Sequence, residues 1–245
     1  MCYDRSRGFL EKRLNFSKTL GGIFSLLFLV LPVSYRHSHP GTWTLRQVLS
    51  RMDQSARTFR SLTAQVKRTK VTVVVNERST ASGTIYVERD GKMRLNILQP
   101  DPRTVLRLRD HLYVYNPLLH QVEEYDLAKH REMVDQFLLL GFGTPTRALE
   151  KAYQISFGGE QTVDNRKTIL LNLTPKAQAI RNQISQIQLW VDESNWLPFR
   201  QKFQEAGTPD YFVIHFSDIV RNANLNKSLF KPNWPKGTQK IKPGS

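Results

Sequence analysis

An alternation of apolar and polar side chains between residues 83 and 99 constrains the fold more than any other part of the sequence. The alternation continues on both sides of the pair Asp90-Gly91, which is a strong hairpin-turn signal because glycine accepts a positive φ without steric cost. A period of two places every second side chain on one face of a strand. The pattern therefore predicts a β-hairpin whose apolar face is formed by Ile85, Val87, Met93, Leu95 and Ile97.

Arg89 has the same parity as Ile85 and Val87, so we expect its side chain at the end of the apolar face. Burying an unpaired guanidinium is costly, which leaves two interpretations. In the first, Arg89 is structural: its stem lies on apolar surface while its charge reaches water or an ion pair. In the second, Arg89 is functional and holds another part of the chain closed over this face. The residues themselves are compatible with both.

The remainder of the chain predicts many strands and few helices. A helix is expected over residues 45–59, because Thr44 and Gln47 have capping-box spacing and apolar residues then recur at helical spacing. Residues 62–75 follow as strand and residues 77–82 as a loop. About ten or eleven strands without an internal repeat indicate one antiparallel sheet, strongly curved or closed, with helices at one face. The chain is therefore assigned to the mainly β, α+β class.

Residues 127–143 have a different pattern, with apolar side chains at helical spacing. The end of this segment is very apolar, contains Phe137, Leu138 and Phe142, and is bounded by Gly141 and Gly143. One interpretation is an ordinary core helix. The other is a mobile lid whose apolar face covers a cavity, and both stay open at the level of sequence.

The amino terminus has the composition of an export signal. The first 20 residues carry five basic and two acidic side chains, and residues 23–33 are apolar except for Ser25. This run has the length of a signal-peptide core and is short for a membrane-spanning helix. Val33-Ser34-Tyr35 does not offer small residues at both cleavage positions, and no cysteine follows the run to allow lipoprotein processing. We therefore predict that residues 1–41 are an export signal or anchor plus a linker, with its cleavage left open.

The formal net charge of +15 favours anionic partners such as nucleic acid or lipid headgroups, or else serves solubility. The basic residues are dispersed, and no zinc-finger or RNA-recognition pattern is present, so we expect no nucleic-acid partner. A cationic surface-binding module stays as one hypothesis, and it predicts strongly salt-dependent binding.

Candidate catalytic and metal-binding patterns are missing from the sequence. The six histidines fall into no metal-ligand spacing, and Cys2 is the only cysteine. Glu123 and Glu124 are adjacent on a predicted strand and should face opposite sides, which argues against acid–base pairing. We therefore expect no enzyme activity, no metal and no cofactor.

Five short motifs together resemble a known family. They are residues 83–89 (GTIYVER), 99–101 (QPD), 113–117 (YVYNP), 173–177 (LTPKA) and 230–237 (FKPNWPKG). In order and spacing they resemble LolA and its relatives, the periplasmic carriers of outer-membrane lipoproteins. The resemblance covers roughly the chain from the predicted helix to the last motif.

The resemblance implies an unclosed antiparallel half-barrel of about eleven strands, with an α-helical lid over a hydrophobic cavity. Residues 42–238 would form this carrier domain and residues 239–245 a basic tail. It also implies a role without catalysis. Such a carrier, expected to be a monomer, accepts acylated lipoproteins from an inner-membrane ABC-type transporter and hands them to an outer-membrane receptor.

The resemblance further implies site residues, since Arg89 matches a family arginine that bonds to the lid and holds the empty cavity closed. Two positions depart from the family: Met93 replaces an aromatic residue, and Asp90 replaces a proline and could pair with Arg89. The clean signal cleavage site usual in the family is also missing, so a membrane-tethered sensor of lipid or lipoprotein with the same fold is an alternative to a carrier. The ligand-binding residues are expected to be Arg89, Met93, Leu95, Ile97, Phe137, Leu138 and Phe142.

Overall fold

The computed structural model describes residues 43–89, 91–127 and 140–242. The chain divides into two units, Met1–His39 and Pro40–Ser245, and every described residue belongs to the second. The predicted export segment lies outside the described residues. No helix in the described ranges is long and apolar enough to cross a membrane.

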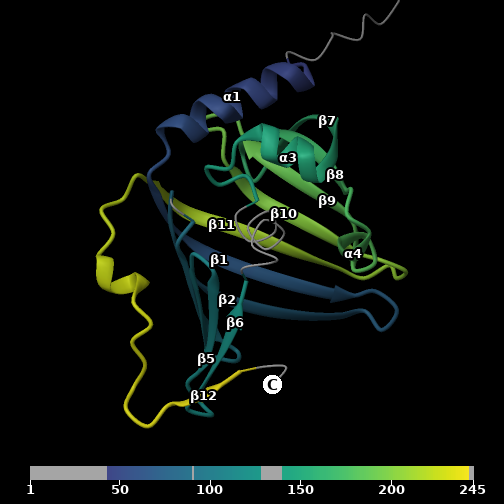
Figure 1. The fold of residues 1–245 in the computed structure, drawn as a ribbon. Helices are drawn as coiled ribbons and strands as arrows, with labels where there is room; N and C mark the ends of the chain where they lie inside the picture. Colours follow the sequence, from purple (N-terminus) through teal and green to yellow (C-terminus); the bar gives the residue numbers. More distant parts are fainter. Residues whose placement is uncertain (1–42, 90, 128–139, 243–245) are drawn as a thin grey trace, which may run out of the picture. The chain divides into compact units, whose positions relative to one another are not determined.

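One sheet dominates the described part of the chain (Figure 1). Its twelve described strands lie in the order β12-β6-β5-β4-β3-β2-β1-β11-β10-β9-β8-β7, so the sheet is unclosed and mainly antiparallel, as predicted. In chain order the elements are α1 (Leu45–Thr58), β1 (Ser61–Thr72), β2 (Glu77–Glu88), β3 (Met93–Gln99), β4 (Arg103–Leu108), β5 (His111–Asn116), β6 (Gln121–Asp126), α3 (Thr146–Ala152), β7 (Tyr153–Val163), β8 (Arg166–Pro175), α4 (Gln178–Arg181), β9 (Ile184–Asp192), β10 (Pro198–Glu205), β11 (Tyr211–Arg221), the 3-10 helix η1 (Lys227–Phe230) and β12 (Gln239–Ile241).

Helix α1 begins where the capping box predicts. The Thr44 hydroxyl accepts a hydrogen bond from the Gln47 backbone amide, and the Gln47 side chain accepts one from the Thr44 amide. These bonds satisfy donors that a helix start otherwise leaves free. The buried face of the helix then follows the predicted spacing, with Val48, Leu49, Met52 and Ala56.

The predicted hairpin over residues 83–99 is confirmed, with Ile85 opposite Leu95 and Val87 opposite Met93. The prediction just before it is wrong in detail. Residues 73–76 form a turn, and β2 already begins at Glu77, where a loop was expected. Asn76 has a φ of 51°, a left-handed conformation that asparagine tolerates and β-branched residues avoid.

Residues 239–241, the first part of the predicted basic tail, form a strand. β12 pairs with β6 in parallel, with Gln239 opposite Gln121. The Gln239 amide donates to the His120 carbonyl at 2.8 Å, and the Lys240 ammonium forms an ion pair with Glu124. A long-range pairing of this kind leaves no local sequence signal.

The segment before β12 packs on one face of the sheet, against residues of β3 and β5. Trp234 stacks on Tyr115 with ring centroids 5.1 Å apart, and the Leu229 carbonyl accepts a hydrogen bond from Arg94. Figure 1 shows this segment, in yellow, running from the end of β11 past η1 to β12. Among the described residues, this segment therefore lies on only one of the two faces of these strands.

The main hydrophobic core lies where α1 and α3 cover strands β8–β10 (Figure 1). Val48 and Met52 of α1 and Leu149 of α3 pack against fully buried strand residues. The strand residues that face the helices include Ile169, Leu171, Leu173, Ile187, Leu189 and Phe203.

Candidate functional site

We call the face that carries Ile85, Val87 and Met93 the inner face of the sheet. Strand pairing sets Ile85 opposite Leu95, Leu95 opposite Val105, and Val105 opposite Val114. Paired residues of neighbouring strands project to the same side. An apolar row therefore crosses β2, β3, β4 and β5 on the inner face.

Burial changes along this face. Val87 and Met93 are 1% and 2% exposed and belong to a cluster with Phe59 and Phe142. Leu95 and Val105 border the same cluster but are only partly buried. Partly buried apolar side chains on a sheet face are what the wall of a ligand cavity requires.

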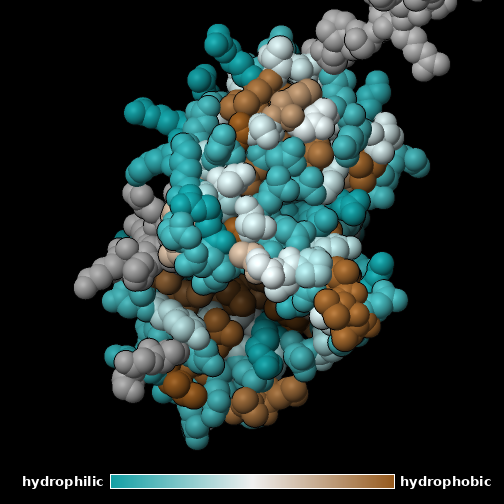
Figure 2. Space-filling view, turned by 90° about the vertical axis from the view of Figure 1, so that its right-hand side faces the viewer, coloured by the Kyte–Doolittle hydropathy of each residue, from teal (hydrophilic) through white to brown (hydrophobic). Residues whose placement is uncertain are grey.

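Figure 2 shows a hollow with hydrophobic walls on one face of the molecule. Ile97, the next residue of the same parity on β3, is also partly buried. Met93, Leu95 and Ile97 therefore share the predicted face, and their role as ligand contacts stays a proposal.

On β6, the next strand after β5, the residues that face the inner side are polar. Glu123 lies opposite Val114 and Tyr125 lies opposite Leu112. The Tyr125 hydroxyl donates to the Glu123 carboxylate, and this hydrogen bond raises the pKa of Tyr125. Glu124 lies opposite Tyr113 on the other face, so the predicted separation of the two glutamates is confirmed.

Arg89 is exposed, and its Nη1 donates to the Arg57 carbonyl at 3.0 Å. That carbonyl lies in the last turn of α1, where a cation is favoured by the helix dipole. The contact supports a structural role for Arg89. Its predicted contact with a lid involves residues of the segment 127–143, most of which, including Phe137 and Leu138, lie outside the described residues.

The described end of that segment is held firmly on the sheet. The Leu140 carbonyl accepts a hydrogen bond from the Gln201 side chain at 2.9 Å, and Leu140 is fully buried. Phe142 packs edge-on against Phe216 with ring centroids 4.8 Å apart. Gly143 has a φ of +67°, and a side chain there would collide with Phe59. Phe142 therefore lies at the base of the inner face, as part of its core.

Arg107 is the residue that sequence reasoning missed. It lies opposite Met93 on the inner face and is fully buried, and its Nη1 donates to the Gly91 carbonyl. A Cβ at Gly91 would collide with the same guanidinium. The available signal was parity, because Arg107 is two residues after Val105 on β4 and therefore shares its face.

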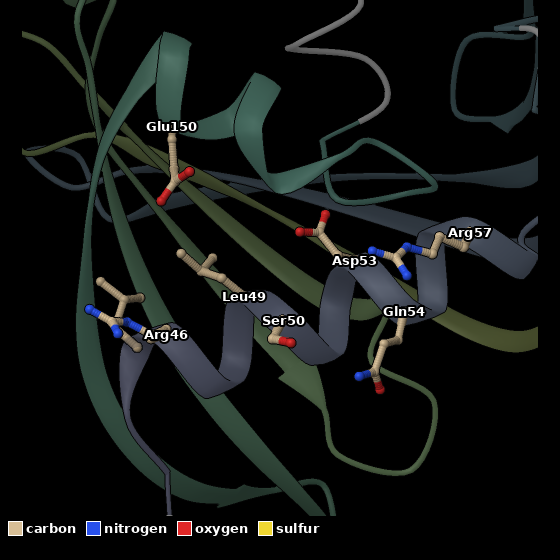
Figure 3. A pocket seen from close by; sticks show the side chains of 8 residues that line it. Arg46, Leu49, Ser50, Asp53, Gln54, Arg57 and Glu150 are labelled. Atoms are coloured by element: carbon tan, nitrogen blue, oxygen red, sulfur yellow. The ribbon is translucent and has the colours of Figure 1, made fainter.

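A groove of about 540 Å³ lies along α1 beside α3 (Figure 3). Asp53 accepts hydrogen bonds there from the backbone amide and the hydroxyl of Thr146, at 2.8 and 2.7 Å. These bonds cap α3, because its own N-cap residue, Pro145, provides no side-chain bond. Asp53 therefore holds the start of α3 on α1. The groove is lined by Leu45, Arg46, Leu49, Ser50, Asp53, Gln54, Arg57 and Glu150.

The described residues contain no group of three or more side chains suited to hold a metal ion.

The family model described as "Outer membrane lipoprotein carrier protein LolA" matches residues 57–233. The chain belongs to the LolA family. The match includes every strand of the inner face and ends before β12. No curated protein matches the chain.

Several solved structures are similar to this chain at low sequence identity. An uncharacterised conserved protein from Thermus thermophilus has a TM-score of 0.55 at 13% identity, covering 80% of this chain and 98% of that chain. The lipoprotein LppX from Mycobacterium tuberculosis has a TM-score of 0.45 at 11% identity, with coverages of 75% and 99%. MucB in the MucA/MucB complex from Pseudomonas aeruginosa has a TM-score of 0.44 at 18% identity, with coverages of 76% and 60%.

Proposed function

We propose that this LolA-family protein binds the acyl chains of lipoproteins on its inner face and carries them through the periplasm. The observation that carries the proposal is the apolar row from Ile85 to Val114, which is only partly buried at Leu95 and Val105. Family membership supports the same role.

The chemistry of this face suits an acyl chain. Burying each CH₂ group contributes about 0.8 kcal/mol and requires no directional bond. Leu95, Val105 and Val114 offer such contact, while Glu123 and Tyr125 give the wall a polar border on β6. Phe137 and Leu138 would add contacts from a lid, and Arg89 would hold that lid closed in the empty protein.

The proposed partners follow from the family. The carrier would receive lipoproteins from an inner-membrane ABC-type transporter and deliver them to an outer-membrane receptor. It would act in the periplasm, without catalysis and as a monomer. The apolar run at residues 23–33 supports export.

Introducing a charged side chain on the inner face by mutation tests the proposal. We expect Leu95→Glu to weaken binding of a fluorescent acyl probe by roughly tenfold or more, because a carboxylate would have to be desolvated beside the acyl chain. Val220→Glu is the matched control, since Val220 is 52% exposed on β11. Equal probe affinity in Leu95→Glu and the wild-type chain, with both folded by circular dichroism, would contradict the proposal.

A second candidate is a membrane-tethered sensor with the same cavity. It is favoured by the apolar run at residues 23–33, which is not followed by small residues at both cleavage positions. Membrane fractionation and intact mass of the expressed chain separate the two. A processed, soluble protein supports the carrier, and an unprocessed, membrane-bound protein supports the sensor.

A further inference from the structure

Exposed apolar side chains gather at the turns of one end of the sheet. Eight large hydrophobic residues are strongly exposed in the described part of the chain, and six of them lie at or beside three turns. Val74 is the most exposed of all, at 82%. The six are Val73, Val74 and Val75 between β1 and β2, Leu98 at the end of β3, and Leu118 and Leu119 between β5 and β6.

These three turns lie at the same end of the sheet because strands β1 to β6 form an antiparallel meander. In such a meander, alternate turns lie at the same end. The turns between β2 and β3 and between β4 and β5 lie at the other end, and none of the strongly exposed hydrophobic residues lies in the described parts of them.

The β1–β2 turn extends well beyond the end of β3. β1 and β2 pair as far as Thr72 opposite Glu77, whereas β3 stops pairing with β2 at Ser82. The hairpin therefore runs five residues, roughly 17 Å, beyond the end of β3.

The turn is ordered by specific bonds. The Val73 amide donates to the Asp210 carboxylate at 2.8 Å, and the Asn76 amide donates to the Val73 carbonyl at 3.1 Å. A fixed turn therefore holds three valines in solvent, which is unfavourable unless something covers them.

Charge around the turn identifies the covering surface. Residues 67–78 contain four basic side chains and one acidic one, Glu77. Residues 231–242, which end in β12 beside the β5–β6 turn, contain four lysines and no acidic residue. Lys70 pairs with Glu205, Lys240 pairs with Glu124, and Arg68 lies over Phe212. The Asp210 carboxylate is occupied by the Val73 amide. Part of the charge is therefore engaged, and the other basic side chains of residues 67–78 favour an anionic surface.

We propose that the β1–β2 turn inserts Val73, Val74 and Val75 into the headgroup boundary of an anionic lipid bilayer. Apolar side chains surrounded by basic ones bind bilayers by entering this boundary to a depth of about 5–10 Å, with attraction to anionic lipids adding to the affinity. A short apolar turn at the tip of a long hairpin suits a deformable lipid surface, whereas a protein partner would require a continuous complementary patch.

The proposal goes beyond the carrier function and does not depend on it. The full-length chain is used for its test, and vesicles are made of phosphatidylcholine brominated along its acyl chains, with phosphatidylglycerol as the minor component. Val74→Trp and Val220→Trp place a tryptophan at the turn and at an exposed position near the far end of β11. Both variants share the same amino-terminal segment and the same native tryptophans.

We expect bromine to quench the added tryptophan of Val74→Trp roughly twofold more than that of Val220→Trp, because only the turn reaches the acyl boundary. Equal quenching in the two variants would overturn the proposal. So would equal quenching of Val74→Trp on vesicles that lack phosphatidylglycerol, since the anionic surface would then have no role.

A second experiment measures vesicle binding by sedimentation. Val74→Asp combined with Val75→Asp should weaken partitioning into anionic vesicles by roughly tenfold, because two valines lose their burial and two like charges meet the surface. Val220→Asp is the control. Leu95→Glu should bind vesicles as the wild type does, so failure of the carrier function and failure of membrane docking give different results.

Discussion

The two halves of the inner face share one pattern and differ in what covers it. On β8 and β9, Leu171 and Leu189 are at most 1% exposed beneath α1 and α3. On β3 and β4, Leu95 and Val105 have the same alternation but remain partly exposed. The covered half is a conventional core that stabilises the fold. The open half has apolar surface left over, and this surplus is the basis of the proposed lipid cavity.

The largest expected effect separates the two halves by stability. Leu171→Ala should lower the free energy of unfolding by about 3 kcal/mol, because it leaves a cavity in packed surroundings. Val105→Ala on the open half should cost about 1 kcal/mol or less, since less contact is lost. Urea denaturation measures both. Similar losses at the two positions would mean that the halves are packed alike.

The helical cover of the packed half can be weakened at its contact between α1 and α3. Asp53→Ala removes both hydrogen bonds to Thr146 and should cost about 1 kcal/mol, as expected for loss of a helix cap. Asp101→Ala, at an exposed turn position, is the control and should change little. Thermal unfolding that leaves Asp53→Ala and Asp101→Ala indistinguishable would refute this role of Asp53.

Substituting Arg89 tests whether a lid covers the open half. Loss of its bond to the Arg57 carbonyl in Arg89→Leu should cost only about 0.5 kcal/mol, typical of a cation at a helix end. If Arg89 also holds a lid closed in the empty protein, Arg89→Leu should bind an acyl probe more tightly and release it more slowly, because binding no longer has to break that contact. Its melting temperature should change only slightly, and Arg89→Lys should be intermediate. Unchanged release in stopped-flow displacement would leave Arg89 with its structural role alone.

The smallest effect concerns the outer face of the open half, where Lys240 beside Glu124 holds the pKa of that carboxyl below its usual range. A lowered folded-state pKa contributes stability above the ordinary carboxyl pKa, and this contribution is lost as pH falls through the lowered value. Glu124→Gln should therefore be slightly less stable than the wild type at neutral pH and equal to it in acid. Urea midpoints at the two pH values check this, and a difference that persists in acid would contradict it.

Much of the fold could be predicted because its signals are local. The capping box of Thr44 and Gln47 determines the start of α1, and parity determines the pairing of Ile85 with Leu95. The strand over residues 62–75 was predicted too long for a physical reason. Three β-branched valines indicate a strand locally, whereas the turn depends on Asn76 and on a contact with Asp210, far along the chain.

The candidate site was only partly predictable. Alternation placed Met93, Leu95 and Ile97 on one face, but it could not show that Met93 is buried while Leu95 is partly exposed. That difference depends on which elements cover the sheet. Arg107 was missed because a charged residue on an apolar strand suggests a solvent-exposed side chain. Its guanidinium is instead buried and donates to the Gly91 carbonyl in the turn between β2 and β3.

The most direct test of the central claim, that the open half holds acyl chains, is native mass spectrometry of the full-length chain expressed with its own amino terminus. Protein purified from the periplasm without detergent should carry an acylated peptide or lipid, and the same material should be missing from Leu95→Glu and retained in Val220→Glu. A wild-type protein that is empty, or a Leu95→Glu variant that carries the same cargo, would contradict the account.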